Sequence, residues 1–227
     1  MARITARPAI MAICLLVVGC APTYKAPPMH EQTAKTASTG KVKVDAYLFN
    51  ARLRRDGKPT SFRLELLQTD SAVVLGGRGY LGRGALKGRM TADSLEIYFP
   101  ATNEYLYESV ADMVVSSFCP GRMQGLNLMR LLRRLPQASD FNVDATLERD
   151  DSDRKRPRFS LSWPDCPWRL QLAYNRQKTS WRLQEIRFDD GEKTSFTAKR
   201  RSFKEQTAVT RKRLKPAVPV DAVRVSP

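Results

Sequence analysis

The sequence predicts an α+β protein that is mainly β, with one antiparallel sheet and a few short helices. Between residues 41 and 202, apolar and polar side chains alternate in one run after another, which is typical of strands with one buried and one wet face. Short connections rich in Asp, Asn, Gly and Thr separate these runs. Both ends of the chain differ in composition, so we expect one folded domain with a different segment on each side.

The first segment, residues 1–19, predicts a lipoprotein signal peptide. Arg3 and Arg7 precede an apolar run at 9–18, which is shorter than the about 20 residues that a spanning helix needs. The run ends in Leu-Val-Val-Gly-Cys and resembles the lipobox of bacterial lipoproteins, whose signal is removed before the cysteine. The resemblance implies that Cys20 is acylated and anchors the protein to membrane lipid. An ordinary signal peptide with a chance cysteine is the alternative.

The lipoprotein resemblance also implies a location. In that family, Asp directly after the lipidated cysteine favours the inner membrane, whereas here the position holds Ala21. We therefore expect an outer-membrane protein that faces the periplasm. Residues 20–40 are poor in large aliphatic side chains and rich in Pro, Thr and Ala, so they predict a flexible tether between the lipid and the domain.

The alternating runs of residues 41–202 predict strands whose apolar rows share one face of a sheet. In the run WRLQEIRF, the alternation changes phase between Leu183 and Ile186, which predicts a β-bulge. The predicted turns are RDGK at 55–58, TADS at 91–94, ATNE at 101–104 and DDGE at 189–192. The predicted apolar lining of the face consists of Phe62, Leu64, Leu66, Leu95, Ile97, Phe99, Val143, Leu161, Leu170 and Leu172. Helices, a ligand or a partner must cover such a face.

Three glycines, Gly77, Gly79 and Gly82, form a G-x-G-x-x-G pattern within LGGRGYLGRGALKGRM. In dinucleotide-binding proteins this pattern joins a strand to a helix whose N-terminus faces phosphate. Here an apolar strand precedes the glycines, but another strand pattern follows them. We therefore interpret these glycines as places where a strand bends or where two backbones approach closely.

Two stretches, residues 109–118 and 123–135, show helical periodicity. In the second stretch Leu128, Leu131, Leu132 and Leu135 lie on one side, and Pro136 ends the helix. We expect this helix to pack over the apolar face of the sheet. A movable lid over a cavity, or a helix face that touches anionic lipid, is the alternative.

The cysteines and the single histidine limit the chemistry. Cys14 is expected to leave with the signal peptide and Cys20 to carry the lipid, so Cys119 and Cys166 remain. Because an exported protein meets an oxidising environment, we expect a disulfide between these two. Two buried reduced thiols are the alternative. The only histidine, His30, falls in the tether, so no Ser-His-Asp site is expected in the domain. No Cys or His spacing indicates a metal site, and we expect neither a cofactor nor a catalytic residue.

The last segment, residues 203–227, predicts a basic and mostly disordered tail. The whole chain has a formal net charge of +16. Because the protein is expected to be exported, we expect envelope polyanions rather than nucleic acid as the tail's partners. The candidate contacts with an anionic surface are Arg211, Lys212, Arg213 and Lys215. A solvated tail without a specific partner is the alternative.

Taken together, these features resemble the outer-membrane lipoprotein-sorting proteins, a family that includes the periplasmic lipoprotein carrier and its outer-membrane receptor. The nearest local match is GRMTADSLEIYFPATNEYLYES, and the resemblance covers residues 41–202. It implies an unclosed, curved antiparallel β half-barrel, with helices on the concave side and a cavity for acyl chains. The receptor's exposed apolar loop residue has no counterpart here, and the basic tail departs from the family pattern.

The sequence supports two functions as hypotheses. The first is an envelope lipoprotein that binds lipid or lipoprotein cargo without covalent chemistry, in an apolar cavity of the curved sheet. The alternative is a docking module of an envelope complex, which uses the sheet surface and the basic tail to hold a protein partner. An enzyme acting on envelope glycans or lipids is the weakest hypothesis, because no nucleophile motif is present.

Overall fold

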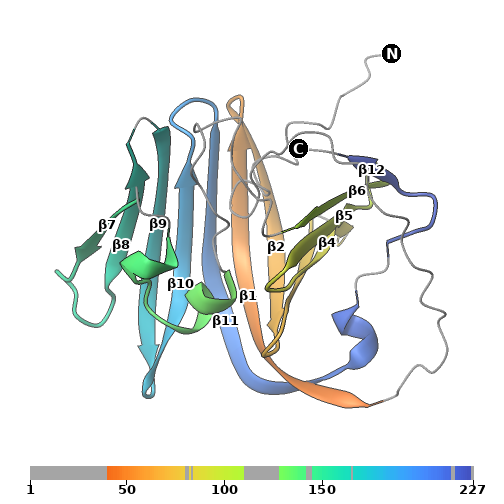
Figure 1. The fold of residues 1–227 in the computed structure, drawn as a ribbon, viewed down its shortest axis with the longest axis horizontal. Coiled ribbons are helices and arrows are strands. Elements are labelled where there is room, and N and C mark those ends of the chain that lie inside the picture. The colour runs from red at the N-terminus through yellow and green to blue at the C-terminus, as the bar shows by residue number, and fades with distance from the viewer. Residues whose placement is uncertain are drawn as a thin grey trace.

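The computed structural model describes residues 40–79, 82, 84–109, 128–141, 145–164, 166–215 and 218–225. The described residues form one sheet of 12 strands and very few helices (Figure 1). The strands are β1 (Lys41–Arg55), β2 (Lys58–Gln68), β3 (Val73–Arg78), β4 (Gly84–Met90), β5 (Ser94–Phe99), β6 (Glu104–Ser109), β7 (Thr146–Asp150), β8 (Arg158–Trp163), β9 (Cys166–Gln177), β10 (Ser180–Asp189), β11 (Thr194–Thr210) and β12 (Val223–Val225). The helices are α2 (Leu128–Arg133), η3 (Ala138–Asp140) and η4 (Arg211–Leu214).

Strands β1 and β11 lie side by side in the middle of the sheet. Its strand order is β12-β6-β5-β4-β3-β2-β1-β11-β10-β9-β8-β7, so the first long strand pairs with the last long strand. Strands β1 to β6 form one antiparallel meander, and β7 to β11 form a second one. Among the described strands, β12 alone pairs in parallel, with β6. Strands β7 and β12 are the two edges, so the sheet remains unclosed, as the sequence predicted.

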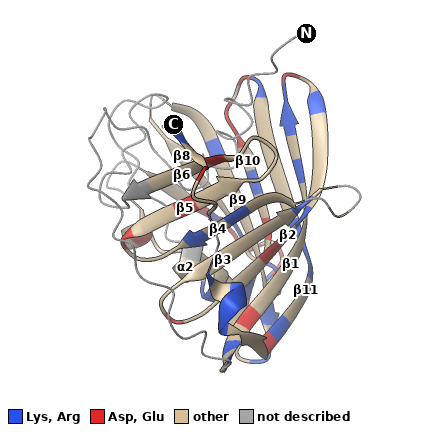
Figure 2. Ribbon diagram, turned by 90° about the vertical axis from the view of Figure 1, so that its right-hand side faces the viewer, with Lys and Arg blue, Asp and Glu red and all other residues tan. Residues whose placement is uncertain are grey.

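Curvature brings the two meanders together around one apolar core. Buried side chains from β1 to β6 and from β8 to β11 belong to a single cluster. Phe62 of the first meander and Phe196 of the second lie with ring centroids 6.4 Å apart. We call the side of the sheet that carries this cluster the inner face, and the opposite side the outer face. Figure 2 shows the curved sheet from the side.

The four predicted turns are confirmed as connections between strands. Asp56 and Gly57 both have positive φ, 47° and 77°, as a two-residue type I′ hairpin turn requires between β1 and β2. Between β10 and β11, the Asp190 carboxylate accepts hydrogen bonds from the backbone N–H groups of Glu192, Lys193 and Thr194. Local polar chemistry therefore fixes these hairpins, and the residues that supply it are visible in the sequence.

The glycines of the G-x-G-x-x-G pattern lie in and after β3, and a hairpin to β4 follows them. A Cβ atom added to Gly77 would lie 2.8 Å from the side-chain Cγ of Leu86. One added to Gly88 of β4 would lie 2.8 Å from the backbone oxygen of Glu96. Pairing between β3 and β4 also shifts register between Gly77 and Arg78. The interpretation of a bend with close packing is confirmed at Gly77, whereas Gly82 lies in the hairpin with a φ of +73° and open space beside it.

The predicted bulge in β10 is confirmed as well. Pairing with β9 shifts register between Leu183 and Glu185, which leaves Gln184 as the extra residue. Its side-chain amide donates a hydrogen bond to the backbone oxygen of Arg200 in the neighbouring strand. The bulge lets Leu183 and Ile186, which are out of phase in the sequence, both join the core.

The expectation of a disordered tail after residue 202 is wrong for the described part of that segment. Strand β11 continues to Thr210 because its second half pairs with the start of β1, from Lys41↔Thr210 to Tyr47↔Phe203. Val209 is buried in a small cluster with Val44, Leu67 and Val74, against which Leu214 of η4 packs. We call this the outer cluster. Charged side chains at the exposed positions of the strand conceal its apolar contacts in the sequence.

Candidate functional site

The inner face gathers the side chains that the sequence predicted as an apolar lining. Nine of the ten belong to the single core cluster, and each is at most 8% exposed. They are Phe62, Leu64, Leu66, Leu95, Ile97, Phe99, Leu161, Leu170 and Leu172. Val143 lies outside the described residues. The structure thus confirms that these residues share one face, while their contact with a ligand stays a prediction.

Helix α2 lies over this face and contributes Leu131 and Leu132 to the core (Figure 1). Two hydrogen bonds from the sheet reach its backbone. The Tyr47 hydroxyl donates to the Leu132 oxygen at 3.3 Å, and the Gln68 amide donates to the Met129 oxygen at 2.6 Å. The second predicted helix is therefore confirmed over residues 128–133, packed on the apolar face. The first, residues 109–118, lies outside the described residues apart from Ser109, which ends β6.

A buried ion-pair cluster holds one side of α2. The Asp45 side chain is 4% exposed and lies 3.4 Å from Arg133 Nε and 3.8 Å from Arg182 Nη2. Arg182 also donates to the Arg133 backbone oxygen at 3.4 Å and lies 3.5 Å from Glu205. We call this the Asp45 cluster. Because a buried carboxylate without a partner is costly, these arginines tie the helix to the sheet.

A second cluster joins α2 to η3, the next element along the chain. The Asp140 side chain is 3% exposed and is bound by Arg134 and, at 3.5 Å, by Arg130. Its other oxygen accepts a hydrogen bond from the Gln137 backbone N–H at 2.9 Å. We call this the Asp140 cluster. Thus two leucines, two hydrogen bonds and the Asp45 cluster attach α2 to the sheet, and the Asp140 cluster attaches it to η3.

A cationic group without a carboxylate lies close to the Asp45 cluster. The guanidinium carbons of Arg182 and Arg200 lie 5.1 and 5.9 Å from the Phe203 ring centroid. Burial lowers the pKa of Arg200, an effect that the nearby Tyr47 opposes and the Arg182 charge reinforces. Arg200 Nη1 is buried without a hydrogen-bond partner, and among the described residues no carboxylate forms an ion pair with Arg200.

The Tyr174 hydroxyl is another buried polar atom without a hydrogen-bond partner. Tyr174 is fully buried in the core, and its ring packs edge-on against Phe159 at 5.7 Å. Burial raises the pKa of this hydroxyl, and the Asp140 charge raises it further. Since buried hydroxyls normally have partners, this atom is available to a polar group that enters the core.

Asp45, Arg182 and Arg200 were not predicted from the sequence, because charged residues inside an alternating strand suggest a wet face. A signal was nevertheless present for two of them. Asp45 lies in phase with Tyr47 and Phe49, and Arg200 lies in phase with Phe196 and Ala198. A charge at an apolar position of a strand predicts a buried charge, which needs a partner or a function.

The four candidate anionic-surface contacts lie in η4 or directly after it. Arg213 is already paired, since its Nη2 atom lies 2.8 and 3.0 Å from the two carboxylate oxygens of Glu65. Arg211, Lys212 and Lys215 are exposed. The structure thus assigns Arg213 a structural contact that holds η4 on the sheet, whereas an anionic-surface contact of the other three stays a prediction.

The predicted lipid attachment and disulfide fall partly outside the described part of the chain. Cys20 and Cys119 lie outside the described residues. Cys166 starts β9 and packs, partly buried, against the core. Over the described ranges, no helix is long and apolar enough to span a membrane. Within the same ranges, no three His, Cys, Asp or Glu side chains gather in a group that could hold a metal ion.

No family model and no curated protein matches the chain. Similar solved structures include an uncharacterized conserved protein from Thermus thermophilus, 17% identical over 79% of this chain and 89% of that one, with a TM-score of 0.39. A DUF1329 family protein from Desulfovibrio piger is 10% identical over 77% and 90%, with a TM-score of 0.44. A LolA superfamily protein from Nitrosomonas europaea is 12% identical over 79% and 91%, with a TM-score of 0.33. At these values the likeness carries no functional argument.

Proposed function

We propose that this protein is an outer-membrane lipoprotein that binds acyl chains, of lipids or of lipoproteins, on the inner face of its curved sheet. The observation that carries the proposal is the large apolar inner face, over which the described part of helix α2, Leu128–Arg133, is fastened by polar contacts. Binding needs no covalent step. It exchanges contacts of Leu131 and Leu132 for contacts with an acyl chain.

The energetics of this exchange favour a reversible lid. Each methylene of an acyl chain that leaves water stabilises the bound state by about 0.8 kcal/mol. A chain of ordinary length therefore offsets the exposure of two leucine side chains and the loss of the hydrogen bonds and the ion pair that hold α2. Arg200, whose Nη1 atom is buried without a partner, supports the proposal because an acidic lipid group would satisfy it.

The test measures uptake of the fluorescent fatty acid cis-parinaric acid by residues 21–227, expressed without the lipid anchor. The Asp45→Asn variant weakens the buried cluster that holds α2, so we expect uptake to become faster by about fivefold or more. Asp70→Asn is the matched control, because Asp70 also binds Arg133, at 3.2 Å, but is fully exposed. It should change the rate by less than about twofold. No uptake by any form, or equal rates for both variants, would contradict the proposal.

The anchor is part of the same proposal and is tested separately. Wild-type protein should incorporate radiolabelled palmitate in cells and sediment with outer membranes, whereas Cys20→Ser should do neither. Continued labelling of Cys20→Ser would refute acylation at that residue. We also propose a bridge between Cys119 and Cys166, which would make the mature protein two mass units heavier after reduction; two freely alkylated thiols would exclude it.

A further inference from the structure

The outer face of strands β1, β2 and β3 carries three arginines that the proposed function does not use. Arg63 and Arg78 are directly opposite each other in the β2–β3 register, and Arg63 is opposite Asn50 in the β1–β2 register. Arg52 lies on β1, two residues after Asn50 and on the same face of the strand. All three arginines are exposed, and together with Asn50 and Ser61 they line a groove of about 620 Å³. We call this groove the outer arginine site.

The charge of this site is not compensated. Among the described residues, no carboxylate forms an ion pair or a hydrogen bond with Arg52, Arg63 or Arg78. Like charges that face each other across two strands destabilise a sheet. Three of them in one groove therefore create a place where an anion is strongly favoured.

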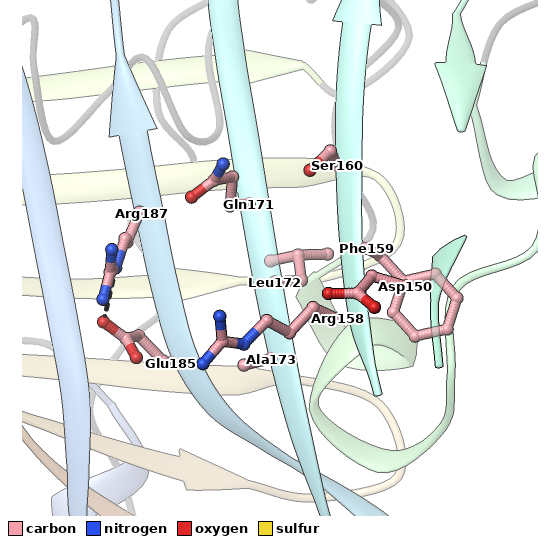
Figure 3. Close-up of a pocket in the computed structure, with 9 residues that line it drawn as sticks. All are labelled: Asp150, Arg158, Phe159, Ser160, Gln171, Leu172, Ala173, Glu185 and Arg187. Atoms are coloured by element: carbon pink, nitrogen blue, oxygen red, sulfur yellow. Dashed lines mark hydrogen bonds and ion pairs between the residues drawn. The ribbon is translucent and has the colours of Figure 1, made fainter. Parts of the chain in front are cut away.

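A second pocket on the outer face shows the opposite arrangement. It has a volume of about 160 Å³ and is lined by residues of β7 to β10 (Figure 3). Here Arg187 Nε lies 2.6 Å from Glu185 Oε1, and Lys199 from β11 lies 3.7 Å from the same oxygen. In Figure 3 the Arg158 guanidinium lies between Glu185 and Asp150. This pocket shows that acidic neighbours can neutralise basic residues on the outer face. Among the described residues, the outer arginine site has no such neighbours, and this difference points to an anionic ligand there.

One part of the wall of the outer arginine site is glycine backbone. Gly79 and Gly82 line it, and the Gly82 N–H donates to the Gly79 oxygen at 3.2 Å. Gly82 has a φ of +73°, and a Cβ added there would meet no atom within 4 Å. These are two glycines of the G-x-G-x-x-G pattern. A ligand can therefore approach the backbone here, although the pattern leads into a strand and not into a helix as in dinucleotide-binding proteins.

We infer that the outer arginine site binds a phosphate group, held by the guanidinium groups of Arg52, Arg63 and Arg78. Guanidinium matches phosphate because its planar fork donates two parallel hydrogen bonds to two oxygens. Asn50 and Ser61 add neutral donors at the same groove. The phosphate belongs either to a soluble molecule or to a lipid headgroup, and both have the same recognition chemistry. The inference is independent of the inner face and of the proposed acyl binding.

The test titrates inorganic pyrophosphate, and separately vesicles of one part phosphatidylglycerol to three parts phosphatidylcholine, into residues 21–227 at low salt. Arg63→Gln removes the central cation, and we expect it to weaken binding about tenfold, the loss of one charge-assisted contact. Arg169→Gln is the matched control, because Arg169 is an exposed arginine on β9, opposite Asp189 in the β9–β10 register. It removes the same charge and should change binding by less than about twofold.

Two outcomes support the inference and separate the sources of phosphate. Pyrophosphate binding that Arg63→Gln weakens indicates a soluble ligand, and vesicle binding alone that Arg63→Gln weakens indicates a headgroup. Equal effects of Arg63→Gln and Arg169→Gln, or binding of neither probe, would overturn it. Thermal unfolding checks the fold, since removing one of two facing like charges should leave the melting temperature unchanged or raise it. Pyrophosphate should then raise the melting temperature of the wild type more than that of Arg63→Gln.

Discussion

The two faces of the sheet treat charged side chains in opposite ways. On the inner face, Asp45 and Asp140 are almost fully buried, and each is bound by two arginines. On the outer face, charges are exposed, and some, such as Arg63 and Arg78, face each other without a carboxylate among the described residues. An unpaired polar atom costs more inside than outside because the dielectric there is low. On the inner face, a single unpaired group such as Arg200 therefore indicates a binding site. On the outer face, a cluster of unpaired charges is needed to indicate one.

The largest expected difference between the faces is in packing, and two adjacent residues test it. Trp168 is 2% exposed in the core, and Arg169 is exposed on the outer face. Trp168→Ala should lower the free energy of unfolding by about 3 to 5 kcal/mol, because it leaves a large cavity. Arg169→Ala should change it by less than about 0.5 kcal/mol. Urea unfolding of the two variants measures both values, and similar losses would break the distinction between the faces.

Two carboxylates bound by arginine test the distinction for ion pairs. Asp140 of the inner face is buried, whereas Asp151 is 50% exposed and lies 2.7 Å from Arg149. Asp140→Ala should cost about 2 kcal/mol, because it removes a buried carboxylate that Arg134, Arg130 and the Gln137 N–H bind, although the two arginines can still reach water. Asp151→Ala should cost at most about 1 kcal/mol. Urea unfolding provides the comparison, and about 1 M salt should reduce only the smaller effect.

Alkaline pH tests the burial of the Tyr47 hydroxyl, the group that donates a hydrogen bond to α2. Burial raises the pKa of Tyr47 from 10.0 to about 12. Because the folded state holds this proton more tightly than the unfolded state, the stability contribution is complete below pH 10 and is lost as pH rises through about 12. The loss is on the order of 2 to 3 kcal/mol. Comparing Tyr47→Phe with wild type by unfolding at about pH 9 and about pH 11.5 isolates it. An identical pH dependence of the two proteins would show that Tyr47 is not responsible.

Much of this fold could be predicted from the sequence because its signals are local. Asp56 and Gly57 specify a hairpin turn, the phase change after Leu183 specifies a bulge, and Leu131 and Leu132 mark the buried side of α2. Non-local pairing could not be predicted in this way. The second half of β11 is ordered by contact with β1, and the partners of Asp45 come from α2 and β10. The outer arginine site likewise depends on the register of β2 and β3, which places Arg63 opposite Arg78.

The most direct test of acyl binding on the inner face is the native mass of residues 21–227, purified gently without the lipid anchor, before and after extraction with organic solvent. We predict an excess mass before extraction, released as phospholipid or acylated peptide, and reduced occupancy in Arg200→Leu. A clean mass before extraction, together with no binding of added lipids, would contradict the proposal. That result would favour the docking module as the function, and the next step would be to search for a protein partner.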